Sequence, residues 1–282
     1  MDTELLHSPL HDFCPSEAMR DASLTGDHTR RMGQVTIAVV ERQRAIDRML
    51  TAIRSRSCDI FAFCNMHTFN LALNSPAFSA ALSKATVFND GIGIDVASRI
   101  LFGAPFPDNL NGTDLTPALL ASLDRSTSLY LVGGPPGVAE EAARVLESRF
   151  ACVSVVGCHH GFFTQAEGEQ IADRIRASRA DLVLVGMGNP RQELWSAEVA
   201  ERTGAVMLCV GAFLDFMAGR FSRAPLFMRA IRSEWIYRLA LEPQRLAKRY
   251  IGGAVPFVWA IMIERMRRPR NGEHRTSPQL PR

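Results

Sequence analysis

The sequence predicts an α/β protein with a mainly parallel sheet, helices on both faces of the sheet, and a basic amphipathic C-terminal helical appendage. Short β-rich runs alternate with helical patterns of roughly 10 to 16 residues, which is typical of βαβ units. Of the 282 residues, 47% are hydrophobic, enough to bury one sizeable core. The last quarter of the chain differs from the rest in its excess of arginine.

Six runs are predicted as strands because β-branched and other apolar residues dominate them. In chain order they are VTIAVV from Val35, IFAFC from Ile60, SLYLVGG from Ser128, CVSVVG from Cys152, DLVLVGMG from Asp181 and AVMLCVG from Ala205. Polar loops lie at four expected strand ends: CNMHTFN, and the glycine-containing FNDGIGID, VGMGNPRQE and VGAFLDF. Ligands collect at the carboxyl ends of the strands in such sheets, so we expect these loops to build one pocket.

Charge is divided unevenly along the chain. Residues 1–218 hold 18 Lys and Arg against 25 Asp and Glu, whereas residues 219–282 hold 14 against 4. We therefore predict a mobile N-terminal arm over 1–33, an α/β catalytic core over 34–218, and an Arg-rich membrane-associating appendage and tail over 219–282. The basic appendage suggests a polyanionic partner, either a membrane surface, a nucleic acid or phosphates.

Missing motifs argue against several classes of protein. The chain has only two lysines and lacks the G-x-x-x-x-G-K-[ST] signature of a P-loop ATPase. It also lacks the G-x-S-x-G elbow of a serine hydrolase. The turn SLYLVGGPPGVAEE is not the G-x-G-x-x-G of a Rossmann dehydrogenase. That turn suits either a bound phosphate or an ordinary helix start, and we favour the helix start.

Cysteine usage and the N-terminus indicate a cytoplasmic protein. The six cysteines include no C-x-x-C pair, and several lie in apolar runs, where a thiol behaves as a small hydrophobic group. The first 31 residues carry acids early and no apolar segment of a secretory signal. We expect reduced cysteines.

The stretch FNDGIGID, residues 88–95, carries the candidate catalytic acid. Asp90 is followed by glycines at 91 and 93, which would leave its carboxylate uncovered at a strand end. An acid in that place can act as a general base. The alternative is that Asn89 or Asp90 caps a helix starting at Ile92 and serves the structure only.

The stretch VGMGNPRQELW offers a second candidate site. A strand ends in two glycines, and Asn-Pro then opens a helix with Arg191, Gln192 and Glu193 in its first turn. Helix starts offer free N–H groups and a partial positive charge, which suits an anionic or amide-bearing ligand. An equally open alternative is a helix cap built from Asn189, Pro190 and Glu193 without any ligand.

The C-terminal region intersperses arginines with Phe, Trp, Tyr and Leu as far as Gly253. This pattern fits a nucleic-acid surface, a membrane-interface helix or a phosphate clamp. Ten apolar residues follow, Ala254–Ile263, too few to span a bilayer, which needs about 20. Because arginines flank them, we favour a helix in the membrane interface over a core helix.

Six motifs occur in a fixed order: FCNMHTFNLA, DGIGID, NGTDL, GMGNPRQELW, GAFLDFMAG and RAPLFMRAIRSEWIYRLALEPQRLAKRY. Together they resemble the WecG/TagA/CpsF family of bacterial glycosyltransferases, from about residue 35 to residue 252. The resemblance implies an inverting enzyme that moves a hexose from a UDP-sugar to a polyprenyl-diphosphate-linked sugar. It would work at the inner face of the cytoplasmic membrane, in the synthesis of exopolysaccharide or cell-surface polysaccharide. We favour glucose as the donor sugar, with N-acetylmannosamine or its uronic acid as the alternative.

The resemblance also implies roles for individual residues. Asp90 would be the base, Asn65 and Thr68 would line the sugar and nucleotide pocket, Gln192 would meet the nucleotide, and Asp215 would lie near the uridine. Further expected substrate contacts are Asn89, Gly91, Gly112, Asp114, Gly188, Glu193, Arg223, Arg232 and Arg238.

The expected chemistry uses neither metal nor cofactor. None of the 14 aspartates forms an Asp-x-Asp motif, so we expect arginines of the appendage to hold the diphosphate. Many family members carry a basic residue before G-x-D-L, where this chain has Asp108 and Asn109. That contact is either missing here or supplied by Arg99 or the tail.

The expected partners are the UDP-sugar, the lipid-linked acceptor and a membrane surface, and a homo-oligomer is compatible with the sequence. The main alternative is an α/β module that binds nucleic acid or membrane without catalysis. An acidic body with strand-end glycines does not favour nucleic acid.

Overall fold

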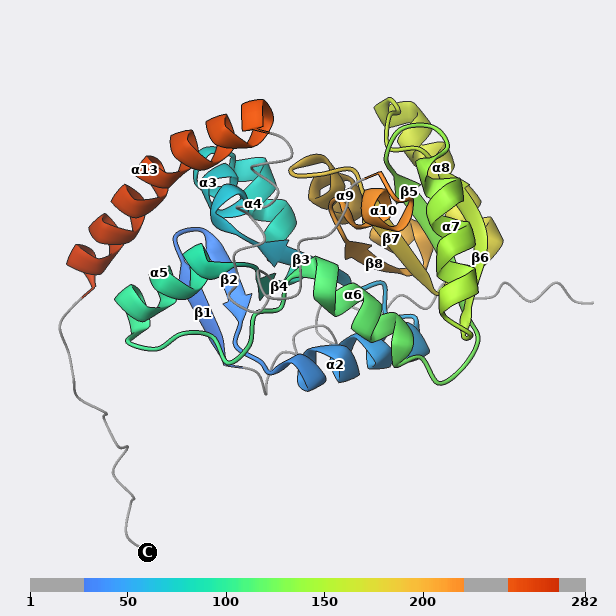
Figure 1. The fold of residues 1–282 in the computed structure, drawn as a ribbon, viewed down its shortest axis with the longest axis horizontal. Helices are drawn as coiled ribbons and strands as arrows, with labels where there is room; N and C mark the ends of the chain where they lie inside the picture. The colour runs from blue at the N-terminus through green and yellow to red at the C-terminus, as the bar shows by residue number, and fades with distance from the viewer. Residues whose placement is uncertain (1–27, 221–242, 269–282) are drawn as a thin grey trace, which may run out of the picture.

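The computed structural model describes residues 28–220 and 243–268 (Figure 1). Its central sheet has six parallel strands in the spatial order β4-β3-β8-β7-β5-β6. The strands are β3 (Ile60–Cys64), β4 (Ala85–Asn89), β5 (Thr127–Gly133), β6 (Val153–His159), β7 (Leu182–Gly186) and β8 (Val206–Cys209). The predicted α/β class with a mainly parallel sheet is confirmed.

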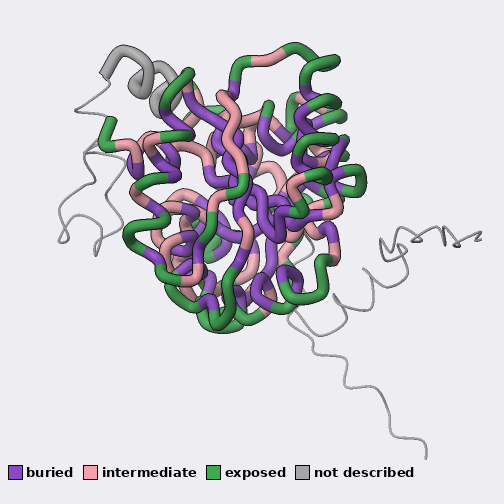
Figure 2. Tube along the Cα trace, turned by 90° about the vertical axis from the view of Figure 1, so that its right-hand side faces the viewer, coloured by how far each residue is buried: buried purple, intermediate pink, exposed green. Residues whose placement is uncertain are grey.

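Alternate residues of the strands supply two separate core clusters, one on each face of the sheet. In β7, Leu182 and Leu184 belong to one cluster, and Val183 and Val185 belong to the other. Every residue of β3, β7 and β8 is buried, as expected where helices cover both faces of a parallel sheet. Figure 2 shows the buried segments running through the middle of the molecule.

Helices cover both faces of the sheet. The helices on the first face are α2 (Arg42–Ser55), α6 (Gly112–Ala121), α7 (Val138–Arg149) and α10 (Phe213–Met217). Those on the second face are α3 (Met66–Asn74), α4 (Pro76–Ser83), α5 (Ile92–Phe102), α8 (Gln165–Ser178), α9 (Arg191–Thr203) and α13 (Pro243–Arg267). Because all six strands run the same way, the loops that follow them meet at one edge of the sheet.

A small hairpin stands apart from the main sheet. Strand β1 (Thr29–Met32) pairs antiparallel with β2 (Val35–Ala38), and Gly33 in the turn has a φ of 54°. The run from Val35, expected in the alternating series, therefore pairs with a neighbour across a tight turn and stays outside the parallel sheet. Residues 29–33 of the predicted arm belong to this hairpin, and residues 1–27 lie outside the described residues.

Helix α13 brings the C-terminal region back onto the core. Phe257 and Ile261 are buried, and the Phe257 ring meets the ring of Phe69 on α3 edge-on, with centroids 5.1 Å apart. The apolar stretch predicted as an interface helix is thus partly a core helix, because one side of it packs against α3 and α5. Its outward side remains apolar and exposed. Among the described helices, none is long and apolar enough to cross a membrane.

Candidate active site

A pocket of about 520 Å³ opens at the carboxyl edge of the central sheet. The four loops singled out in the sequence all contribute to its wall, through Asn65 after β3, Asp90 after β4, Gly188 after β7 and Asp215 after β8. Strands β3 and β8 are neighbours in the sheet although they are far apart in the chain. Loops that leave neighbouring strands in different directions open a crevice between them, and the pocket lies there.

Asp90 lines this pocket and is held by the neighbouring strand. Its backbone N–H donates to the carbonyl of Cys64 at 2.8 Å, and Asn65 Nδ2 donates to Asp90 Oδ2 at 3.2 Å. Gly91, with a φ of 87°, occupies the N-cap of α5. The alternative in which Asn89 or Asp90 caps that helix therefore does not hold. The Asp90 carboxylate is oriented by an amide side chain at the pocket wall.

Asn65 connects helix α3 to the acid. Its Oδ1 accepts hydrogen bonds from the backbone N–H groups of His67 and Thr68, at 3.0 and 3.1 Å, and so caps α3. Its Nδ2 is thereby turned toward Asp90. Thr68 is fully buried, and its hydroxyl donates to the same Oδ1 at 3.3 Å. The structure thus places Asn65 on the pocket wall and Thr68 behind it.

Hydrogen bonds of Asp108 and Asn109 hold the segment that leads from α5 to α6. Asn89, fully buried, donates to the carbonyl of Asp108 at 2.8 Å. Asn109 Oδ1 accepts from the backbone N–H of Gly91 at 2.9 Å. Asp108 accepts from the first backbone N–H of α2. In the described part of the chain, Asn89, Gly91 and Arg99 lie outside the pocket lining.

The NGTDL motif builds the start of α6. Asn111 Oδ1 caps this helix by accepting from the backbone N–H of Asp114, and Asn111 Nδ2 donates to the Asp114 carboxylate at 2.9 Å. Asp114 thus supports the helix start, apart from the pocket lining that the structure describes. Gly112 does line the pocket, and a Cβ there would lie 2.9 Å from the Phe63 ring. A larger residue at 112 would therefore force the Phe63 ring to shift.

The helix start at α9 is organised by a buried amide and a buried carboxyl. Gln192 Oε1 accepts from the backbone N–H groups of Gly188 and Gly211, at 3.2 and 3.1 Å, and so joins the loops after β7 and β8. Gln192 Nε2 donates to Glu193 Oε1 at 2.7 Å, and Asn189 Nδ2 donates to the same oxygen. Gln192 and Gly188 line the pocket. The amide of Gln192 is therefore engaged mainly in holding the two glycine loops.

Glu193 supports this arrangement from behind the wall. It is 1% exposed, and within the described residues it lies outside the pocket lining. Burial raises the pKa of Glu193 from 4.5 to about 7, against the opposing effect of the hydrogen bonds from Gln192 and Asn189. The cap proposed from sequence is also different in detail, since Pro190 occupies the N-cap of α9.

Two arginines on the pocket wall were not among the predicted contacts. Arg191, in the first turn of α9, lies over the ring of Phe162 at 5.9 Å. Arg220 forms an ion pair with Asp215, with 3.8 Å between Nη1 and Oδ1. The position of Arg191 directly after Gly-Asn-Pro was an available signal. Arg223, Arg232 and Arg238, which were predicted, lie outside the described residues.

The turn after β5 also reaches the pocket. Gly134 and Pro135 line the wall, together with Gly161 from the loop after β6. We favoured a purely structural helix start for this turn, and α7 does begin directly after it, at Val138. The turn thus both precedes a helix and lines the pocket. Gly134 adopts a φ of 68°, which lets the backbone curve back over the sheet edge.

No metal site accompanies these groups in residues 28–220 and 243–268. Within those ranges, no group of three or more His, Cys, Asp and Glu side chains is placed to hold a metal ion.

The fold and the pocket define the class of protein. An acid and two guanidinium groups line a pocket at the carboxyl edge of a parallel sheet, which is where α/β proteins bind their ligands. The chain belongs to the WecG/TagA/CpsF family of glycosyl transferases, whose model matches residues 30–271. The match covers most of the chain and confirms the resemblance carried by the six motifs. The protein is therefore a glycosyltransferase, and its family indicates polysaccharide synthesis.

Proposed function

We propose that this glycosyltransferase transfers a hexose with inversion from a UDP-sugar to a polyprenyl-diphosphate-linked sugar, with Asp90 as the base. The observation that carries the proposal is the position of Asp90, which lines the pocket and is oriented by Asn65 at 3.2 Å. A base in that place takes the proton of the acceptor hydroxyl as the new C1–O bond forms. The bond from C1 to the phosphate oxygen breaks at the same time, and its electron pair leaves on the diphosphate.

Stabilisation of the departing diphosphate is the second requirement. Guanidinium groups bind phosphate through two hydrogen bonds and need no metal. Arg191 and Arg220 line the pocket, and we assign this task to them. Arg223, Arg232 and Arg238, outside the described residues, are proposed to join them. The sequence lacks an Asp-x-Asp motif, which supports a transfer that does not depend on a metal.

The remaining details follow from the resemblance and the charge distribution. Glucose is our favoured donor sugar, and N-acetylmannosamine or its uronic acid is the alternative. The net excess of ten positive charges in residues 219–282 supports attachment to an anionic membrane surface. We propose that the protein is peripheral on the inner face of the cytoplasmic membrane, and that the product enters exopolysaccharide or another cell-surface polysaccharide.

A panel of UDP-sugars tests the function. Each is incubated with a short polyprenyl-diphosphate-sugar acceptor, with and without EDTA, and the glycosylated product is measured by mass spectrometry. We expect product with one UDP-hexose and little change on adding EDTA. Absence of product with every donor would favour a binding module without catalysis, and a strict need for Mg²⁺ or Mn²⁺ would refute the metal-independent mechanism. Arg191→Ala and Arg220→Ala should each lower transfer by about 10-fold or more, as expected for lost contacts to a charged group.

A further inference from the structure

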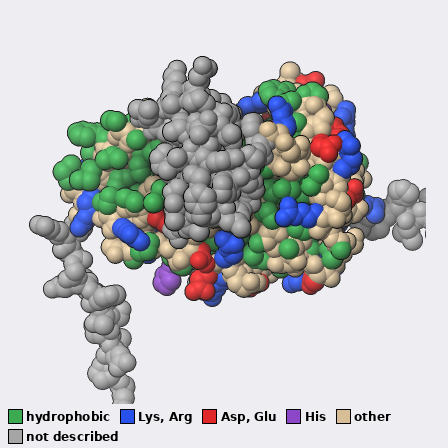
Figure 3. All heavy atoms as spheres, viewed as in Figure 1, with side chains coloured by type: hydrophobic (Ala, Val, Ile, Leu, Met, Phe, Trp, Pro, Cys, Tyr) green, Lys and Arg blue, Asp and Glu red, His purple; other side chains and the backbone are tan. Residues whose placement is uncertain are grey.

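Exposed apolar side chains gather on one side of the molecule. Of the twelve large hydrophobic residues that are exposed in the described chain, nine lie on α3, α5 and α13. Figure 3 shows apolar side chains massed over α13 and α5. We call these nine residues the apolar face: Leu73, Ile92, Val96, Ile100, Val255, Val258, Trp259, Met262 and Met266. An exposed surface of this kind marks a site that contacts a membrane or another protein.

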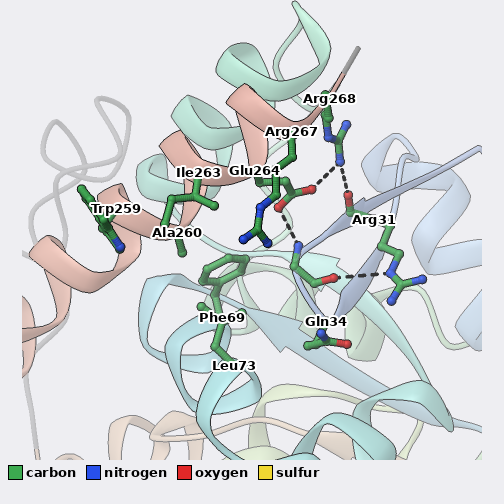
Figure 4. A pocket seen from close by; sticks show the side chains of 11 residues that line it. Arg31, Gln34, Phe69, Leu73, Trp259, Ala260, Ile263, Glu264, Arg267 and Arg268 are labelled. Atoms are coloured by element: carbon green, nitrogen blue, oxygen red, sulfur yellow. Dashed lines mark hydrogen bonds and ion pairs between the residues drawn. The ribbon is translucent and has the colours of Figure 1, made fainter.

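A second pocket of about 530 Å³ opens at the edge of the apolar face. It lies between the β1–β2 hairpin, α3 and α13 (Figure 4). Phe69, Ala260 and Ile263 contribute apolar wall, and Leu73 and Trp259 belong both to this wall and to the apolar face. Among the described residues, this pocket and the candidate active site share no lining residue.

The polar side of this second pocket carries an excess of positive charge. Its charged residues are Arg31, Arg267, Arg268 and one acid, Glu264. Arg268 and Glu264 form an ion pair with 2.6 Å between Nη2 and Oε1. Arg268 also donates to the backbone carbonyl of Arg31, and Glu264 accepts from the backbone N–H of Gly33, so both bond the hairpin. Arg31 and Arg267 are exposed, and neither forms an ion pair with a carboxylate in the described part of the chain.

We propose that this second pocket binds the headgroup of an anionic phospholipid when the apolar face lies on a bilayer. The phosphate would meet the guanidinium groups of Arg31 and Arg267, and the first methylenes of the acyl chains would lie against Trp259 and Leu73. This arrangement, with arginines on one side of the pocket and apolar side chains on the other, matches a ligand with an anionic head and an apolar tail. The inference rests on the membrane attachment proposed above, which it deepens by assigning a headgroup site outside the active site.

Charge complementarity selects this occupant. A zwitterionic headgroup would add an ammonium beside two arginines, whereas an anionic headgroup such as phosphatidylglycerol adds no positive charge. A second copy of the chain would have to present an acid above an apolar surface. The described apolar face itself carries arginines at its rim, Arg265 and Arg267, so two such faces would repel each other.

Helix α13 offers a matched control for the test. Arg265 and Arg267 are both exposed, and two residues correspond to about 200° of helical rotation, so they lie on opposite flanks of α13. Only Arg267 lines the pocket. Arg267→Glu and Arg265→Glu make the same change of charge on the same helix, at sites where folding tolerates it.

Binding of the full-length protein is measured by sedimentation with vesicles of phosphatidylcholine, alone or mixed with phosphatidylglycerol. We expect binding to the mixed vesicles, with Arg267→Glu weakening it by on the order of 10-fold and at least several-fold more than Arg265→Glu. Soluble dihexanoyl phosphatidylglycerol should change the fluorescence of Trp259, and the change should disappear in Trp259→Phe. Dihexanoyl phosphatidylcholine should give no such change.

Several other outcomes would overturn the proposal. Equal losses in the two Arg→Glu variants would mean diffuse attraction without a site. A response to a polyprenyl diphosphate but not to phosphatidylglycerol would make the pocket an acceptor site. A change in oligomeric state of Arg267→Glu, measured by sedimentation velocity, would make the face a subunit contact.

Transfer to a detergent-soluble acceptor is assayed in parallel. If transfer works without headgroup binding, only this inference fails. If headgroup binding occurs without transfer, only the proposed function fails.

Discussion

Replacement of Asp90 by asparagine tests the base directly. The variant keeps an oxygen that can accept the hydrogen bond from Asn65 Nδ2, which measures 3.2 Å in the wild type. The backbone bond from residue 90 to the Cys64 carbonyl is untouched. The structural cost should therefore stay within about 1 kcal/mol of unfolding free energy. The change removes the ability of residue 90 to accept a proton, and general base catalysis contributes about 100-fold to 10,000-fold.

We expect Asp90→Asn to lower turnover by at least about 100-fold, equivalent to about 2.7 kcal/mol in the activation barrier. Initial rates at saturating donor and acceptor measure turnover, and calorimetry measures the affinity for UDP, which should be nearly unchanged. The matched control is Asp108→Asn, because Asp108 bonds the start of α2 and lies outside the described pocket lining. Turnover of Asp90→Asn within about threefold of the control would refute the assignment of the base.

Three further predictions concern stability, measured by urea unfolding. Burial raises the pKa of Glu193 from its ordinary value of 4.5 to about 7 in the folded protein, so the wild type loses stability as the pH rises between those values. The unfolding free energy of Glu193→Gln, relative to that of the wild type, should therefore rise by about 2 to 3 kcal/mol from pH 5 to pH 8. A difference that does not change with pH would contradict the raised pKa of this buried carboxyl. A Cβ at residue 133 would clash with the backbone of β7, so Gly133→Ala should cost about 3 kcal/mol or more, and a near-neutral variant would mean that the two strands can separate there. Phe257→Ala should lower the unfolding free energy by about 3 to 4 kcal/mol because the ring is buried. The control Val258→Ala, at an exposed position, should change it by no more than about 0.5 kcal/mol. Equal costs would show that α13 does not dock as described.

The parallel sheet was predictable because its strands are short, apolar and separated by helical patterns. The runs IFAFC and DLVLVGMG carry that signal without ambiguity, since IFAFC forms β3 and the LVLVG part of the second run forms β7, both fully buried. The run from Val35 has the same composition, yet it pairs with Thr29–Met32 in a hairpin. Composition reports that a segment will be extended and buried, but the partner strand depends on tertiary contacts.

The pocket was predictable to the level of loops, and less so to the level of side chains. Asp90 lies on the wall because it follows β4 directly, and Gln192 does so because it lies in the first turn of α9, after the loop that leaves β7. Glu193, one position further on, points into the core and is buried, since successive residues of a helix differ by about 100° in direction. Arg220 was placed in the appendage because of its neighbours' composition, although its ion pair with Asp215 holds it at the pocket. Such pairs depend on distance in space, which motif spacing does not report.

The bonds between Glu264, Arg268 and the hairpin join segments more than 230 residues apart in the chain. These bonds therefore fasten the two ends of the described fold to one another, and neither end should unfold locally without the other. Hydrogen exchange at the hairpin amides and in the last turns of α13 should proceed at matched rates, as in a single cooperative unit. Altering the chain near either end of the fold would then loosen the other.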